Sequence, residues 1–203
     1  MKKFFDSKWA DQKVLIGELI KGDPEAFKHV VEEYHNLMLS VARAIVGQSI
    51  ADEVVQDAWI SAIKALPQFE GRSSLKTWLI RIVSNGAKSR VRRENRYVSL
   101  DDGWEAVSAD HFDHKGHRID NIEAWDDNTP EAILANSQLQ NIIEQAFQNL
   151  PAMQRATLTL SDMEGFKIDE ICNILDISSS NARVLLHRAR AAIHHSIEQY
   201  QDK

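Results

Sequence analysis

Apolar residues recur along most of this chain at steps of three and four residues, which is the spacing of one face of an α-helix. Segment 51–66 shows the pattern most cleanly. Its apolar stripe consists of Ala51, Val54, Val55, Ala58, Trp59, Ala62, Ile63 and Leu66. No segment alternates apolar and polar residues in the way that predicts a half-buried strand. The sequence therefore predicts an all-α protein.

Start and stop signals place the neighbouring helices. Asp23 followed by Pro24 predicts a helix start, because aspartate caps free backbone N–H groups and proline fits the first turn. Gly47 interrupts the periodic pattern that follows. Another helix is expected over 75–93. Its predicted buried side consists of Leu75, Leu79, Ile82 and Val83.

The C-terminal third predicts a second helical module, which starts near Pro130. An apolar stripe over 139–150 is stopped by Pro151, and a further apolar series runs up to Met163. A short helix over 167–175, a tight turn and a longer helix over 178–198 complete the module. We therefore expect two small helical domains in this chain.

Charge is distributed unevenly, although the whole chain carries a net charge of −6. Residues 1–98 carry 16 basic and 12 acidic side chains, residues 99–135 carry 2 and 10, and residues 136–203 carry 6 and 8. The acidic middle also lacks apolar periodicity, so we expect a flexible linker that is extended by self-repulsion. The predicted boundaries are a domain at 10–96, a linker at 97–130 and a domain at 131–198.

Segment 166–193 has the features of a helix-turn-helix. Cys172 stands where the first helix needs a small residue, and Asp176 occupies the turn position usually held by glycine. Aspartate is among the few residues that tolerate a left-handed backbone. On the second helix, the outward face suits the DNA major groove and consists of Ser180, Arg183, Val184 and His187. Arg188 and Arg190 lie on its flanks, where phosphate contact is expected.

A second DNA-binding surface is predicted on helix 75–93. One side of this helix carries Arg81, Asn85, Lys88 and Arg92. The preceding loop, 69–74, offers an aromatic ring at Phe69, backbone donors at Gly71 and two serine hydroxyls. Such groups can hold an unstacked base by stacking and by edge hydrogen bonds. Trp78 is placed either to support the helix or to stack on a base.

The remaining composition excludes several classes of protein. Cys172 is the sole cysteine, so no intramolecular disulfide forms. No apolar run approaches the roughly 18 residues of a membrane span, so we expect no membrane insertion and a cytoplasmic location. We expect neither a catalytic residue nor a cofactor.

Together these motifs resemble the RNA polymerase sigma factors of bacteria, specifically the extracytoplasmic-function (ECF) group of the sigma-70 family. Segment 51–59 resembles the family's helix that binds core RNA polymerase. Segment 69–82, with Asn85, resembles its segment for promoter melting and −10 recognition. Segments 150–155, 164–165 and 186–190 resemble its −35-binding domain. The resemblance implies a protein that directs polymerase to promoter DNA and that is commonly controlled by an anti-sigma factor.

The resemblance also implies three sets of site residues. Those for core polymerase are Asp52, Glu53, Gln56, Asp57 and Ile60. Those for the −10 element are Phe69, Gly71, Arg72, Ser73, Ser74, Lys76, Trp78, Arg81, Asn85, Lys88 and Arg92. Those for the −35 element are Ser179, Ser180, Asn181, Arg183, Val184, His187, Arg188 and Arg190. The surroundings of Arg183 depart from the family's usual polar and basic residues, so promoter sequence cannot be copied from relatives.

Three other interpretations stay open from sequence alone. His111, His114 and His117 form an H-x₂-H-x₂-H run among acids, which suits a transition metal and would make a metal-sensing variant or a small metal-dependent enzyme. A dimeric helix-turn-helix regulator would act without polymerase, but it leaves the basic helix at 75–93 unexplained. A pure protein-interaction module explains neither basic face.

Overall fold

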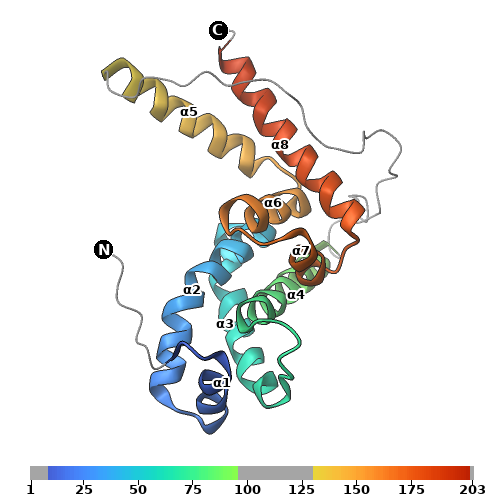
Figure 1. The fold of residues 1–203 in the computed structure, drawn as a ribbon. Coiled ribbons are helices and arrows are strands. Elements are labelled where there is room, and N and C mark those ends of the chain that lie inside the picture. Colours follow the sequence, from blue (N-terminus) through green and yellow to red (C-terminus); the bar gives the residue numbers. More distant parts are fainter. Residues whose placement is uncertain (1–8, 96–129, 202–203) are drawn as a thin grey trace. The chain divides into compact units, whose positions relative to one another are not determined.

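The computed structural model describes residues 9–95 and 130–201, and within these ranges it contains helices and no strands. The chain divides near residue 101 into two compact units. Helices α1 to α4 build the first unit and helices α5 to α8 build the second, apart from residues 173–176 at the end of α7, which group with the first (Figure 1). The predicted linker, apart from Pro130, and the three histidines at 111, 114 and 117 lie outside the described residues. The all-α prediction is confirmed.

Three helices pack around the core of the first unit: α2 (Pro24–Val46), α3 (Gln48–Ala65) and α4 (Leu75–Asn95). A single 3-10 turn, η2 (Leu66–Gln68), follows α3. Met38, Val55 and Leu79 are almost completely buried between the three helices. Burying each such side chain contributes roughly 1.5–3 kcal/mol, so the apolar stripes hold the unit together.

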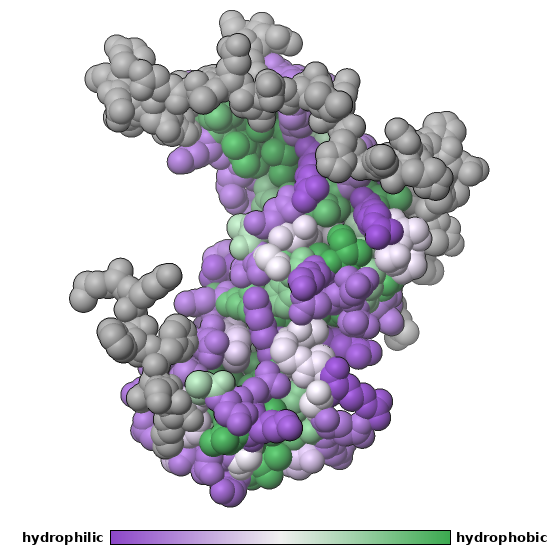
Figure 2. All heavy atoms as spheres, viewed as in Figure 1, coloured by the Kyte–Doolittle hydropathy of each residue, from purple (hydrophilic) through white to green (hydrophobic). Residues whose placement is uncertain are grey.

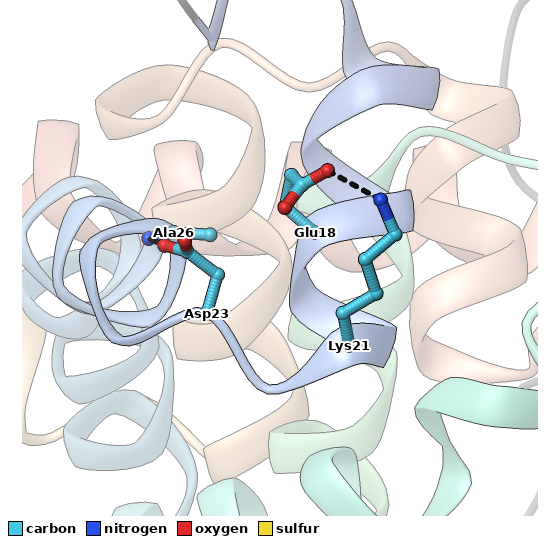
Figure 3. Close-up of polar contacts among 4 residues, drawn as sticks. All are labelled: Glu18, Lys21, Asp23 and Ala26. Carbon is cyan, nitrogen blue, oxygen red and sulfur yellow. Dashed lines mark hydrogen bonds and ion pairs between the residues drawn. The ribbon is translucent and has the colours of Figure 1, made fainter.

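The short helix α1 (Gln12–Lys21) joins this core through a tightly bonded turn. Gly22 ends α1 with a left-handed φ of 81°, and the Asp23 N–H donates to the Glu18 carbonyl at 3.0 Å. The Asp23 carboxylate then accepts from the Ala26 N–H at 2.9 Å, which starts α2 as predicted (Figure 3). Because one residue serves both helices, α1 is fixed relative to α2.

The second unit contains α5 (Pro130–Gln148), α6 (Ala152–Leu158), the π-helical turn η3 (Thr159–Met163), α7 (Ile168–Leu175) and α8 (Ser179–Gln201). Its core cluster unites Leu150, Leu158, Leu186 and Ala189. The Arg155 guanidinium donates to the Gln148 and Leu150 carbonyls, at 2.7 and 3.3 Å, at the end of α5. Arg155 therefore satisfies carbonyl groups at the C-terminal end of α5.

Three expected core positions differ from the prediction. Ile63 is 51% exposed and Ile82 is only half-buried, because the apolar stripes are wider than the faces that neighbouring helices cover. Met163 is 64% exposed. The Glu164 N–H donates to the Thr159 carbonyl five residues back, so the π turn shifts the 3.6-residue period and turns Met163 outward.

No helix among the described residues is long and apolar enough to cross a membrane. The visible surface is mostly hydrophilic, and smaller hydrophobic areas lie among the hydrophilic residues (Figure 2). A small pocket in the first unit is lined by apolar side chains from all four helices, including Leu19, Phe27, Trp59 and Trp78.

Candidate nucleic-acid and protein interfaces

The helix-turn-helix has the turn geometry that its sequence predicts. Asp176 has a φ of 58° and is the one non-glycine residue with a positive φ among those described. The Ile177 N–H donates to the Cys172 carbonyl at 3.2 Å and closes the end of α7. The Ser178 hydroxyl accepts from the Asn181 N–H at 3.2 Å and thereby caps α8. The turn therefore fixes how the second helix leaves the first.

Helix α8 separates a buried side from an outer face. Ala182 and Ala189 are completely buried, whereas Arg183 and His187 are exposed and Val184 is half-buried. Ser179 and Ser180 are exposed in the first turn, and Asn181 and Arg188 are half-buried. These six polar residues and the half-buried Val184 present hydrogen-bonding, cationic and apolar groups, the three kinds of contact that base edges and phosphates accept.

Arg190 is engaged within the protein. Its guanidinium donates to both Asp162 oxygens, at 2.9 and 2.6 Å, and so joins α8 to the π turn. These bonds hold the pKa of the Asp162 carboxyl below its usual range and raise the pKa of Arg190. The predicted phosphate contact of Arg190 stays a prediction, and it now has to compete with this ion pair.

Helix α4 carries the predicted basic side. Arg81, Asn85 and Arg92 are exposed, as predicted. Lys88 lies on the same side by helical spacing, but it is only 8% exposed, so the expected exposure is wrong for this residue. The Ser74 hydroxyl accepts from the Thr77 N–H at 3.1 Å and contacts the Thr77 hydroxyl at 2.8 Å. Ser74 is thus the N-cap of α4, a role that already occupies one of the two hydroxyls predicted for base binding.

The loop at 69–74 is held at its first end by an aromatic contact. The rings of Phe69 and Trp78 lie 4.9 Å apart at 50°, and Trp78 also lines the apolar pocket. Trp78 therefore supports the loop from within the unit. Gly71 has a φ of 71°, which favours glycine, and Arg72 pairs with Glu70. Ser73 is exposed in the same loop, and Lys76 is half-buried in the first turn of α4.

Helix α3 presents an exposed face that is acidic and partly apolar. Asp52, Gln56 and Asp57 are exposed, and Ile60 is 52% exposed beside them. Glu53 belongs to this face but also accepts two hydrogen bonds from Arg90 of α4, at 2.8 and 3.2 Å. An exposed isoleucine among carboxylates is better suited to contacting another protein than to contacting a nucleic acid.

The sequence did not indicate the partners Asp162 and Arg90, because 28 and 37 residues separate them from the residues that they bind. No group of three or more potential metal ligands occurs within the described ranges. Burial is the main cause that raises the pKa of the Cys172 thiol, which keeps it protonated. The candidate sites are therefore the exposed faces of α3, α4 and α8.

Two protein families match this chain. The sigma-70 region 2 family matches residues 30–97, and the sigma-70 region 4 family matches residues 140–193. The ECF RNA polymerase sigma-E factor of Escherichia coli strain K12 is 31% identical over 186 residues, which cover 92% of this chain and 94% of that protein. The protein of the same name from Haemophilus influenzae is 29% identical over the same share of this chain and 95% of its own length.

Two solved structures share the fold. The structure of CnrH in complex with the cytosolic domain of CnrY matches with a TM-score of 0.57 at 20% identity, covering 92% of this chain and 97% of that one. The sigma factor RpoE from Bartonella quintana, crystallised with the anti-sigma factor NepR, matches with a TM-score of 0.59 at 21% identity, covering 85% and 96%. With both sigma-70 regions matched in order and a relative above 30% identity along nearly the whole length, this chain belongs to the ECF group of the sigma-70 family of RNA polymerase sigma factors.

Proposed function

We propose that this protein binds core RNA polymerase and directs it to a specific class of promoters, where it acts in the cytoplasm as an initiation factor and catalyses no step itself. The observation that carries the proposal is the presence of two basic, exposed helix faces, on α4 and α8, in a chain that belongs to the sigma factors. Two separate DNA-binding faces suit the recognition of two separate promoter elements.

We assign residues 10–96 to polymerase binding and the −10 element, residues 97–130 to a linker, and residues 131–198 to the −35 element. On α3, the exposed residues Asp52, Gln56, Asp57 and Ile60 would contact polymerase. Glu53 has to share its carboxylate with Arg90 or release it. The carboxylates of α3 would meet a basic surface of polymerase, and Ile60 would be buried at the contact.

The −10 site would be the loop 69–74 together with the basic side of α4. Phe69 and the loop backbone would hold an unstacked base, while Arg81, Asn85 and Arg92 follow the single strand. Preferential binding of the single strand shifts the duplex equilibrium toward opening, so melting needs no ATP. On α8, Arg183 would read a base edge and Arg188 would contact a phosphate.

We further propose that an anti-sigma factor controls this protein. The support is by analogy: one of the similar structures is a complex of a sigma factor with an anti-sigma factor. The surfaces such a partner would block are the ones assigned above to polymerase and DNA. A pull-down from the source organism with the full chain as bait tests this, and recovery of polymerase alone would count against it.

Run-off transcription tests the proposed function. Purified core polymerase and fragmented genomic DNA are incubated with and without the full-length protein, and new discrete start sites are expected only when the protein is present. Gln56→Ala combined with Asp57→Ala should abolish polymerase binding, because both side chains belong to the proposed polymerase contact. Both are exposed, so the variant should still fold. Arg183→Ala should weaken −35 binding by about 1–3 kcal/mol.

The matched control for Arg183→Ala is Arg43→Ala, which removes the same charge from an exposed position on α2. No new transcripts, together with DNA binding in the absence of polymerase, would replace this proposal with a dimeric helix-turn-helix regulator. Normal transcription by both site variants would show that the sites are wrongly assigned.

A further inference from the structure

The first turn of α4 obtains one of its hydrogen bonds from a distant helix. The N-terminal N–H groups of a helix have no partner within the helix and need an acceptor from elsewhere. Ser74 supplies two acceptors, its hydroxyl for the Thr77 N–H and its carbonyl for the Trp78 N–H. The Leu75 N–H instead donates to the side-chain oxygen of Gln12, at 3.1 Å and 63 residues away.

This bond lies where the proposed base-binding loop ends. The contact between Phe69 and Trp78 holds the first end of loop 69–74, and the bond from Leu75 to Gln12 holds the second. Between the two ends, the described contacts of the loop are local, such as the pair of Arg72 with Glu70. The position of the second end therefore depends on where α1 presents Gln12.

Helix α1 is built to present Gln12 at a fixed place. Leu15 and Leu19 are 4% and 3% exposed and anchor α1 in the core of the first unit. The Asp11 carboxylate caps the start of α1 by accepting from the Lys13 N–H at 2.8 Å. The turn at 22–23 and the ion pair between Glu18 and Lys21 hold its other end (Figure 3). Gln12 stands in the first turn of this anchored helix.

We propose that Gln12 is a positioning residue for the −10 site: its side-chain oxygen fixes the start of α4 and so holds loop 69–74 in the shape that receives a base. Helix α1 precedes residues 30–97, which match sigma-70 region 2, so the site extends beyond the part that the family match covers. This inference rests on the proposed function, since it assigns a role within the proposed single-strand site.

The test compares two substitutions of Gln12 in the full-length protein. Gln12→Met keeps the length of the side chain but removes the acceptor. Gln12→Glu keeps an acceptor and adds a negative charge, which suits the positive end of α4. Lys13→Met is the matched control, because Lys13 is exposed on the same turn and its side chain makes no described contact with α4.

Promoter opening by the holoenzyme is measured as permanganate reactivity of −10 thymines on a promoter found by run-off transcription. Gln12→Met should lower the opening rate roughly threefold to tenfold, the loss expected for one net hydrogen bond. Gln12→Glu should open within about twofold of wild type, and Lys13→Met should match wild type. Polymerase affinity should be equal for all four proteins, which shows that the Gln12 variants are folded.

Opening by Gln12→Met at the wild-type rate would overturn the inference. Equal defects in Gln12→Met and Gln12→Glu would also overturn it, because keeping an acceptor at position 12 would then make no difference. A parallel loss of polymerase affinity in Gln12→Met would overturn it too, because the substitution would then disturb the whole unit and not the −10 site. Failure of the wild-type protein to start transcription would instead remove the proposed function. The two failures are therefore distinguishable in one set of reactions.

Discussion

Replacing Arg190 by methionine should leave the salt dependence of duplex DNA binding unchanged. The Arg190 guanidinium is held by Asp162 through two hydrogen bonds of 2.9 and 2.6 Å, so two of its five N–H donors are occupied and its charge is already paired with a carboxylate. The Arg190 and Asp162 side chains are 57% and 36% exposed. An ion pair this exposed stabilises the fold by about 0.2–1 kcal/mol, so the variant should still be folded.

The magnitude follows from counterion release. The slope of log K against log salt concentration is negative, and each phosphate contact with duplex DNA adds about 0.9 to its magnitude; the slopes below are given as magnitudes. Arg190→Met should change the slope by almost nothing, whereas Arg188→Met should lower it by about 0.9. Asp162→Asn should release Arg190 and raise the slope by about 0.9. Asp169→Asn removes the same charge from an exposed position on α7 without releasing an arginine, and it should leave the slope unchanged.

Fluorescence anisotropy with a labelled duplex of random sequence, over roughly 50 to 200 mM salt, measures these slopes for the full chain. Random sequence is sufficient because phosphate contacts do not depend on the bases. An equal fall in slope for Arg190→Met and Arg188→Met would refute the reasoning. Arg190 would then be a phosphate contact, as its position on α8 predicts, and Asp162 would release it when DNA binds.

Three further predictions concern stability, measured by chemical denaturation. Gly86→Ala should stabilise the first unit by about 0.5–1 kcal/mol, because a methyl group there meets only the Val54 Cγ1 at 3.8 Å and alanine favours the helix. Asp176→Gly should stabilise the fold by roughly 1 kcal/mol, since a φ of 58° suits glycine better than aspartate, and Asp176→Ala should destabilise it because alanine tolerates this φ less well. The lowered pKa of Asp162 means that its pair with Arg190 stabilises the fold fully above the ordinary carboxyl value of about 4. The advantage of wild type over Asp162→Asn should therefore disappear as pH falls below that value, and a constant difference down to about pH 2 would contradict it.

Local chemistry let the sequence alone determine the helices and the turn of the helix-turn-helix. Asp23 caps α2, the left-handed Asp176 closes the turn, and Ala182 faces the core, all as their local patterns predict. Each of these features depends on residues within about one or two helical turns, where 3.6-residue spacing and capping operate. The outer face of α8 could be predicted for the same reason, because a buried side defines the opposite side.

Only the tertiary structure decided which of these residues are already engaged. The pairs of Arg190 with Asp162, Glu53 with Arg90 and Leu75 with Gln12 join positions 28, 37 and 63 residues apart. No periodicity links such positions, because their approach depends on how whole helices pack. Likewise, Met163 is exposed because a π turn interrupts a pattern that reads as continuous helix. The sequence by itself therefore predicted which helix faces are candidate surfaces, and packing determined which side chains on those faces are already engaged within the protein.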